Sequence, residues 1–134
     1  MRKQFFVLIM MIMIGMGICI NVRAEDKTGF FVENGSSYYY KNGVIQMGIT
    51  EIEGENYFLG EYTGKVQVGF VTSSLTGDHY YTDSTGKIQT GFVTIGEDTY
   101  YFDSDGKLQY GITEIGGEDY FLGEYTGKVQ VGFV

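Results

Sequence analysis

Short runs of apolar and aromatic residues alternate with polar, Gly-containing segments along most of the chain. In the clearest example, the β-prone runs Phe92–Ile95 and Thr99–Phe102 flank a Gly-Glu-Asp segment, and Asp103–Gly106 provides a second turn. Two such runs joined by a few residues that include Gly predict a β-hairpin. Gly recurs several times in each hairpin, and no apolar stripe follows the 3.6-residue period, so the pattern disfavours helix.

The hairpin pattern occurs five times, each time from a Gly that precedes Phe or Ile. The units are residues 29–47, 48–68, 69–90, 91–110 and 111–131, and residues 132–134 begin a sixth. Residues 48–71 match residues 111–134 at 22 of 24 positions, which indicates duplication of a three-unit block. Because a lone hairpin is marginal in water, we expect an all-β solenoid of stacked hairpins, with residues 132–134 capping the last.

The first 24 residues differ in character from the repeats. Arg2 and Lys3 precede the apolar run 5–20, and Ala24 is a small residue suited to signal-peptidase cleavage. This order predicts a helical signal peptide over residues 1–24. A membrane anchor is the alternative, but a spanning helix needs about 20 apolar residues. A lipoprotein signal at Cys19 fits less well, because Ile18 is not small.

Cleavage after Ala24 would leave a strongly acidic chain without Cys or Pro. It would hold six lysines against 17 acidic residues, a net charge of −11. Such a surface argues against nucleic acid and anionic lipid as partners, so contact with a membrane is expected only through an uncleaved signal segment. Stability in an exported chain without disulfides must come from packing of the repeats.

The fourth unit carries the motif Gly-Phe-x₃-Gly-x₃-Tyr-Tyr-Phe-Asp-x₂-Gly-Lys-x-Gln. This motif resembles the cell-wall-binding repeats of Gram-positive surface proteins, which are also called choline-binding or glucan-binding repeats. It is also similar to the C-terminal receptor-binding repeats of large clostridial toxins. The resemblance covers residues 29–134 and implies stacked hairpins with ligands held in aromatic grooves between them. The family usually has Trp after the first Gly, where this chain has Phe or Ile.

Alternation along a strand puts Tyr100 and Phe102 on one face and Tyr101 on the other. The resemblance then implies ligand-binding residues where Phe-type units are adjacent. These are Phe70, Tyr81, Phe92 and Tyr101. The alternative for each is a place in the core. A choline cage favours Trp, and the chain has none, so choline is a less favoured ligand than a sugar ring, which one flat aromatic face can hold.

The sequence predicts no catalytic site, no metal site and no cofactor. The single histidine, His79, has no accompanying nucleophile motif, and Asp103–Gly106 reads as a β-turn rather than a calcium loop. We therefore expect a non-catalytic module, secreted or cell-wall associated, that binds cell-wall polysaccharide, teichoic acid or host glycan. The alternatives are a structural or adhesin-like array that binds protein, and a truncated targeting fragment of a larger wall hydrolase or toxin.

Overall fold

The computed structural model describes residues 27–130, and these form strands and turns without any helix. The predicted all-β class is therefore confirmed for this part of the chain. The predicted helical signal peptide, residues 1–24, lies outside the described residues, as does the predicted cap, residues 132–134. No helix in residues 27–130 has the length and apolar character needed to cross a membrane.

Five antiparallel hairpins follow one another along the chain, and each begins at a Gly. The hairpins are β1 (Gly29–Glu33) with β2 (Ser36–Lys41), β4 (Gly48–Ile52) with β5 (Glu55–Leu59), β6 (Gly69–Thr72) with β7 (His79–Thr82), β8 (Gly91–Ile95) with β9 (Asp98–Phe102), and β10 (Gly111–Ile115) with β11 (Glu118–Leu122). A short third strand, β3 (Val44–Ile45), pairs with β2. The turns use Gly and Asn at positive φ, such as Asn34 at 52° and Gly35 at 80°.

The segment after each hairpin, here called the tail, connects that hairpin to the one before it. Within its own unit, the tail forms a single bridge to the second strand, as in Leu59 with Val66 and Phe102 with Leu108. The tail also donates a backbone hydrogen bond to the preceding hairpin. These bonds run from Val66 to Ser37, Ile88 to Asn56, Leu108 to His79 and Val129 to Thr99, with N···O distances of 2.7–2.8 Å. Each unit is thereby fastened to its sequence neighbour.

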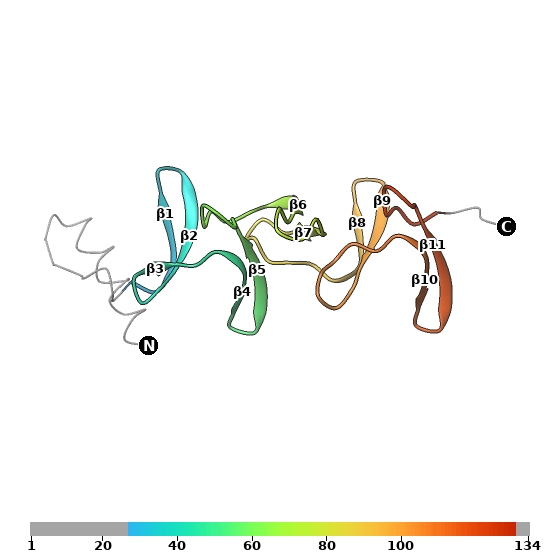
Figure 1. The fold of residues 1–134 in the computed structure, drawn as a ribbon, viewed down its shortest axis with the longest axis horizontal. Helices are drawn as coiled ribbons and strands as arrows, with labels where there is room; N and C mark the ends of the chain where they lie inside the picture. Colours follow the sequence, from blue (N-terminus) through green and yellow to red (C-terminus); the bar gives the residue numbers. More distant parts are fainter. Residues whose placement is uncertain (1–26, 131–134) are drawn as a thin grey trace, which may run out of the picture.

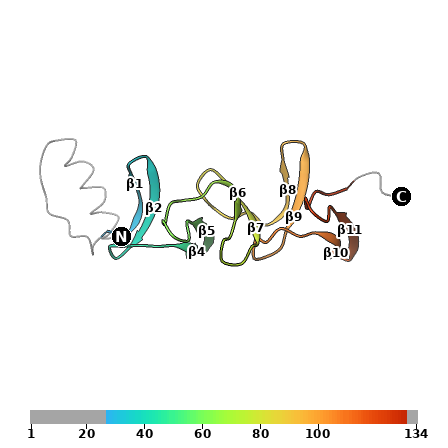
Figure 2. The same ribbon diagram turned by 45° about the horizontal axis from the view of Figure 1, so that its top comes forward.

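The hairpins succeed one another along the long axis of the molecule and point in different directions around it (Figure 1). The hairpins β1–β2 and β8–β9 point the same way, and β4–β5 points the same way as β10–β11. Figure 2 shows the same succession after rotation of the view. Three units therefore complete about one turn, which matches the 63-residue offset of the duplicated block.

The core consists of small clusters that span neighbouring units. Phe58, from β5, packs with Val71, Tyr80 and Ile88 of the following unit. A second cluster joins Tyr100, Phe102 and Leu108, with Tyr81 of the preceding hairpin against it. The last residue of each second strand is nearly inaccessible to solvent in the four units after the first. These residues are Leu59, Thr82, Phe102 and Leu122. Burial of one such side chain contributes roughly 1.5–3 kcal/mol, so the contacts between units supply much of the stability.

Candidate functional site

Aromatic side chains of neighbouring hairpins meet at three partly exposed places. In each, a Phe from the first strand lies opposite a Tyr across the hairpin, and a Tyr of the next hairpin packs against the same Phe. The ring centroids are 4.9–5.4 Å apart in T-shaped or tilted arrangements, which aromatic pairs prefer. Cluster A is Phe30, Tyr39 and Tyr57; cluster C is Phe70, Tyr81 and Tyr100; cluster D is Phe92, Tyr101 and Tyr120.

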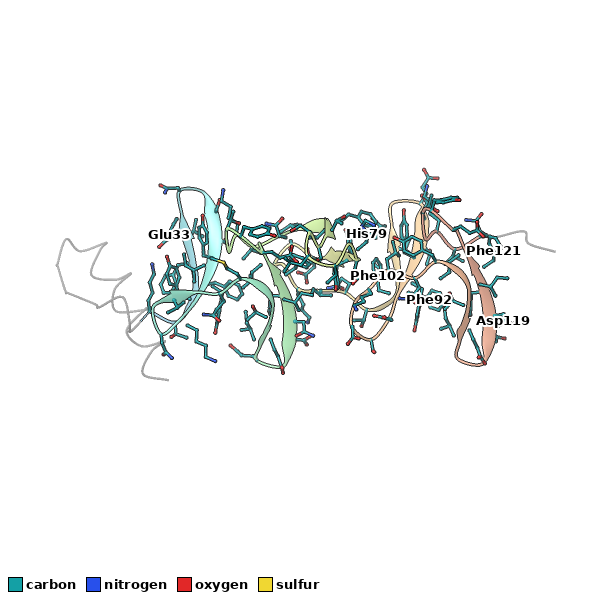
Figure 3. The ribbon with its side chains drawn as sticks, viewed as in Figure 1. Glu33, His79, Phe92, Phe102, Asp119 and Phe121 are labelled. Carbon is teal, nitrogen blue, oxygen red and sulfur yellow. The ribbon has the colours of Figure 1, made fainter. Side chains whose placement is uncertain are left out.

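The four ligand-binding residues predicted from the sequence lie in clusters C and D. Phe70 and Tyr81 form one cross-strand pair, and Phe92 and Tyr101 form the other. Figure 3 shows Phe92 on the fourth hairpin, toward the last hairpin that carries Phe121. The Phe rings are open to solvent, with Phe70 53% and Phe92 46% exposed. Their role in binding remains a prediction, and their exposure leaves part of each Phe ring accessible to a ligand.

The third ring of each cluster was not among the predicted residues. It comes from the Tyr that follows the turn of the next hairpin, namely Tyr57, Tyr100 or Tyr120. The prediction required two adjacent Phe-type units and so passed over cluster A, whose next unit has Ile49 in place of Phe. Since the third ring comes from the second strand of that unit, the Ile does not interrupt the cluster. The signal that would have found it is a Tyr at this position in units two, three, four and five.

A groove of about 710 Å³ lies at cluster A. Its lining includes two rings of the cluster, Phe30 and Tyr57, together with hydroxyl and amide side chains and one lysine. The polar side chains are Ser36, Ser37, Lys65, Gln67, Ser84 and Thr85. An apolar platform with a few polar groups around it is the usual make-up of a small-molecule or saccharide site.

The second unit provides a contrast to these clusters. Here Ile49 lies opposite Phe58, and the ring of Phe58 packs against Tyr80 at 5.4 Å. Both rings are buried, with Phe58 2% and Tyr80 3% exposed, and burial raises the pKa of the Tyr80 hydroxyl. We call this set cluster B. Its two rings belong to the core.

Ion pairs join the tails of units three, four and five to the hairpins before them. The ammonium groups of Lys87, Lys107 and Lys128 lie 3.2, 3.6 and 3.1 Å from carboxylates of the preceding hairpin. The partners are Glu55, Asp78 and Asp98. The charge of Asp78 raises the pKa of Lys107, and the hydrogen bond with Asp98 raises the pKa of Lys128.

The first hairpin already holds an ammonium group on its aromatic rings. The Nζ of Lys27 lies 3.9 Å from the centre of the Tyr40 ring and 4.7 Å from that of Phe31. Glu33 accepts hydrogen bonds from Lys27 at 2.6 Å and from the Tyr40 hydroxyl at 2.7 Å, and the bond from Lys27 lowers the pKa of Glu33. A Phe–Tyr pair in this chain can therefore hold a cation beside a carboxylate.

The side chains of His79, Ser73 and Asp103 have hydrogen-bond partners within the hairpins and turns. His79 is half-buried on β7, and its Nδ1 lies 2.7 Å from the Thr72 hydroxyl. Ser73 donates to Glu61 at 2.5 Å, in a turn. The carboxylate of Asp103 accepts hydrogen bonds from the backbone N–H groups of Asp105 and Lys107, so the β-turn interpretation of residues 103–106 is confirmed.

The chain resembles known wall-binding proteins in both sequence motif and structure. A family model described as a cell wall binding repeat matches residues 90–108. The search of curated proteins found no match. Choline binding protein F from Streptococcus pneumoniae superimposes with a TM-score of 0.72 at 25% identity, over 77% of this chain and 34% of its own.

Two further solved structures show the same fold. CbpJ from Streptococcus pneumoniae has a TM-score of 0.70 at 24% identity, over 78% of this chain and 36% of its own. The pneumococcal cell wall endolysin from phage Cp-1, solved in complex with choline, has a TM-score of 0.57 at 18% identity, over 84% of this chain and 34% of its own. The chain spans about a third of the length of these proteins. The resemblance to the cell-wall-binding, or choline-binding, repeats is thus confirmed.

Proposed function

We propose that this chain is a non-catalytic module of the cell-wall-binding repeat type, which acts outside the cell and holds glycan on aromatic clusters A, C and D. The observation that carries the proposal is the recurrence of one three-ring arrangement between successive hairpins, with a Phe ring exposed each time. The hydrophobic face of a pyranose can stack on such a ring while its hydroxyls bond to nearby polar groups. Cell-wall polysaccharide, teichoic acid and host glycan all present such rings.

Several observations support a binding role rather than catalysis. The groove at cluster A has no carboxylate in its lining among the described residues, whereas glycoside hydrolysis uses two facing acids. Within residues 27–130 no group of three or more His, Cys, Asp or Glu side chains is placed to hold a metal ion. The relatives include binding proteins and a multimodular endolysin, so a place beside a catalytic module is compatible with the same role.

The test is retention of the purified chain on isolated Gram-positive cell walls. We expect the double variant Phe70→Ala, Phe92→Ala to lose about fivefold in affinity for each ring that a glycan contacts, at roughly 1 kcal/mol per aromatic contact. Ile49→Ala is the matched control, because Ile49 is as exposed as Phe92, at 46%, yet belongs to cluster B. Full retention by a folded Phe70→Ala, Phe92→Ala protein would refute the assignment of the clusters.

The Tyr residues of the same pairs give a second, harsher variant. Replacement of both Tyr81 and Tyr101 by Ala should also weaken retention, because it removes a ring from clusters C and D. Tyr81 packs against the core cluster around Phe102, so this variant requires a circular dichroism check of folding. The two Phe positions avoid that complication because their rings lie at the surface.

Choline is the second candidate ligand. It is favoured by the structural likeness to choline-binding proteins and by the ammonium of Lys27, which rests on a Phe–Tyr pair. Against it stands the lack of Trp, the aromatic residue that binds cations most strongly. Elution from cell walls separates the candidates: free choline displaces a choline-bound chain, and wall oligosaccharides without choline displace a glycan-bound one.

A further inference from the structure

In units three, four and five the tail lysine pairs with a carboxylate of the preceding hairpin, and the second unit differs from them in this respect. In units two, three and five the tail lysine bridges to a Tyr of the preceding hairpin, as in Tyr57 with Lys87 and Tyr100 with Lys128. The residue two positions before that Tyr carries the carboxylate partner in units three and five, Glu55 and Asp98 respectively. Asp78, two positions before Tyr80, serves Lys107 in the same way. The register between units thus places an acid beside each of these lysines.

Lys65, in the tail of the second unit, lacks such an acid. It bridges to Tyr38, and the residue two positions earlier is Ser36. Within residues 27–130 Lys65 forms no ion pair, and it is exposed, whereas the other tail lysines are half-buried. The tail sequence does not cause this difference, because residues 61–68 and 124–131 are the same octapeptide, Glu-Tyr-Thr-Gly-Lys-Val-Gln-Val. The residue on the preceding hairpin, Ser36 against Asp98, decides it.

Lys65, whose ammonium group has no ion-pair partner within residues 27–130, lines the groove at cluster A. Lys65 shares the lining of the 710 Å³ groove with the rings of Phe30 and Tyr57. Hydroxyl groups of Ser36, Ser37, Ser84 and Thr85 and the amide of Gln67 complete the polar part of the wall. Although the chain is acidic overall, charges more than about 8 Å away are largely screened at physiological ionic strength. Among the described residues of the lining, Lys65 is the one that carries a charge, and the Asp83 carboxylate beside the lining accepts a hydrogen bond from the Thr85 hydroxyl at 2.6 Å.

We propose that the groove at cluster A binds a saccharide that carries an oxyanion, with the sugar ring on Phe30 and Tyr57 and the oxyanion on Lys65. The shared chemistry is a phosphate ester or a carboxylate attached to the sugar. This inference rests on the proposed glycan-binding function and adds a division of labour: cluster A takes the anionic ligand. Clusters C and D, whose neighbouring lysines are neutralised by Asp78 and Asp98, take neutral rings.

The experiment measures binding of the whole chain to matched oligosaccharides: neutral forms, uronate-bearing forms and phosphate-bearing forms. We expect the unmodified protein to prefer the anionic forms, and Lys65→Gln to weaken only those by about fivefold. Lys128→Gln is the matched control, because the same octapeptide surrounds it, and it should leave the preference unchanged. The uronate and phosphate arms identify which oxyanion is the better ligand.

Two reciprocal variants test the proposed cause. Ser36→Asp should give Lys65 an internal partner and abolish the preference for anionic forms. Asp98→Ser should free Lys128 beside cluster D and add a second anionic site. If the chain binds glycans with no preference between neutral and anionic forms, or if Lys65→Gln and Ser36→Asp leave a preference intact, the inference fails while the glycan-binding function stands. If no oligosaccharide binds, both fail.

Discussion

Units two and five have nearly the same sequence but different surroundings. They differ at only two positions between residues 48–68 and 111–131, yet Phe58 is 2% exposed and its counterpart Phe121 is half-buried. The ring of Phe58 packs against Tyr80 of unit three. The comparison shows that a unit's own sequence fixes its hairpin, whereas its neighbours decide which side chains form core.

The upstream sides of the two units differ in another way. Both are held by a backbone bond from the tail to the preceding hairpin, through Val66 in one and Val129 in the other. The tail lysine is paired with Asp98 in unit five, whereas Lys65 in unit two forms no ion pair within residues 27–130. A backbone contact that any residue can make is thus repeated unchanged. The side-chain contact of the tail lysine differs between the two units, and the charge presented at the surface differs with it.

The largest expected effect is the loss of stability when Phe58 of unit two, or its counterpart Phe121 of unit five, is replaced by Ala. Phe58→Ala removes a buried ring and leaves a cavity, which should destabilise the chain by about 3–5 kcal/mol. Phe121→Ala removes a half-buried ring and should cost about 1–2 kcal/mol. Urea denaturation followed by circular dichroism measures both. Equal losses would contradict the claim that unit three, rather than the unit's own hairpin, buries Phe58.

A smaller effect is expected at the tail glycines, where the upstream contacts are alike. A Cβ at Gly64, φ 77°, would lie within van der Waals overlap of Ile45, and one at Gly127, φ 74°, would lie 2.9 Å from Leu108. Alanine at either position combines left-handed strain with overpacking, at about 2–4 kcal/mol together. The two variants should therefore resemble each other, unlike the two Phe variants.

A matched control separates the cost of the steric overlap with the preceding unit from the cost of the left-handed backbone. Gly96 has a φ of 66° but open space around its Cβ position, so Gly96→Ala should cost only the strain, about 1–2 kcal/mol. Thermal unfolding of Gly64→Ala, Gly127→Ala and Gly96→Ala would measure this difference in stability. A Gly127→Ala protein as stable as Gly96→Ala would mean that tails do not press on the preceding unit.

The sequence predicted the hairpins because their determinants are local. Turn residues such as Asn34 and Gly35 adopt the positive φ that the turns need, and alternation correctly set Tyr100 and Phe102 apart from Tyr101. The four Phe and Tyr residues singled out from the sequence are cross-strand partners, Phe70 with Tyr81 and Phe92 with Tyr101, because register within a hairpin follows from its turn.

The contacts between units were harder to predict. The third ring of each cluster, the groove at cluster A and the missing partner of Lys65 all depend on which residues of two successive units lie opposite each other. That register is fixed by bridges such as Tyr38 with Lys65. Period and composition do not reveal it, because the residues involved lie 27 to 30 positions apart and in different units.

The smallest expected effect concerns Glu61, which fastens the turn of unit two to unit three. Its carboxylate accepts hydrogen bonds from the hydroxyls of Ser73 and Ser74 and from the Ser74 backbone N–H. These bonds, the Ser73 hydroxyl first, lower the pKa of Glu61 below its ordinary value of 4.5. The ionised form is thus favoured by folding, and the stabilisation is complete above pH 4.5 and lost as the pH falls through the lowered value.

Glu61→Gln should therefore flatten the decline of the urea midpoint below pH 4.5 relative to the unmodified chain. The double variant Ser73→Ala, Ser74→Ala should flatten it as well, because it removes the donors and leaves the carboxylate. Glu33 and Asp83 also have lowered pKa values and titrate in the same acid range, so a decline persists in every variant. The quantity to compare is the slope of the urea midpoint against pH, in each variant and in the unmodified chain. Parallel curves would show that these hydrogen bonds of Glu61 add nothing to the stability of the contact between units two and three.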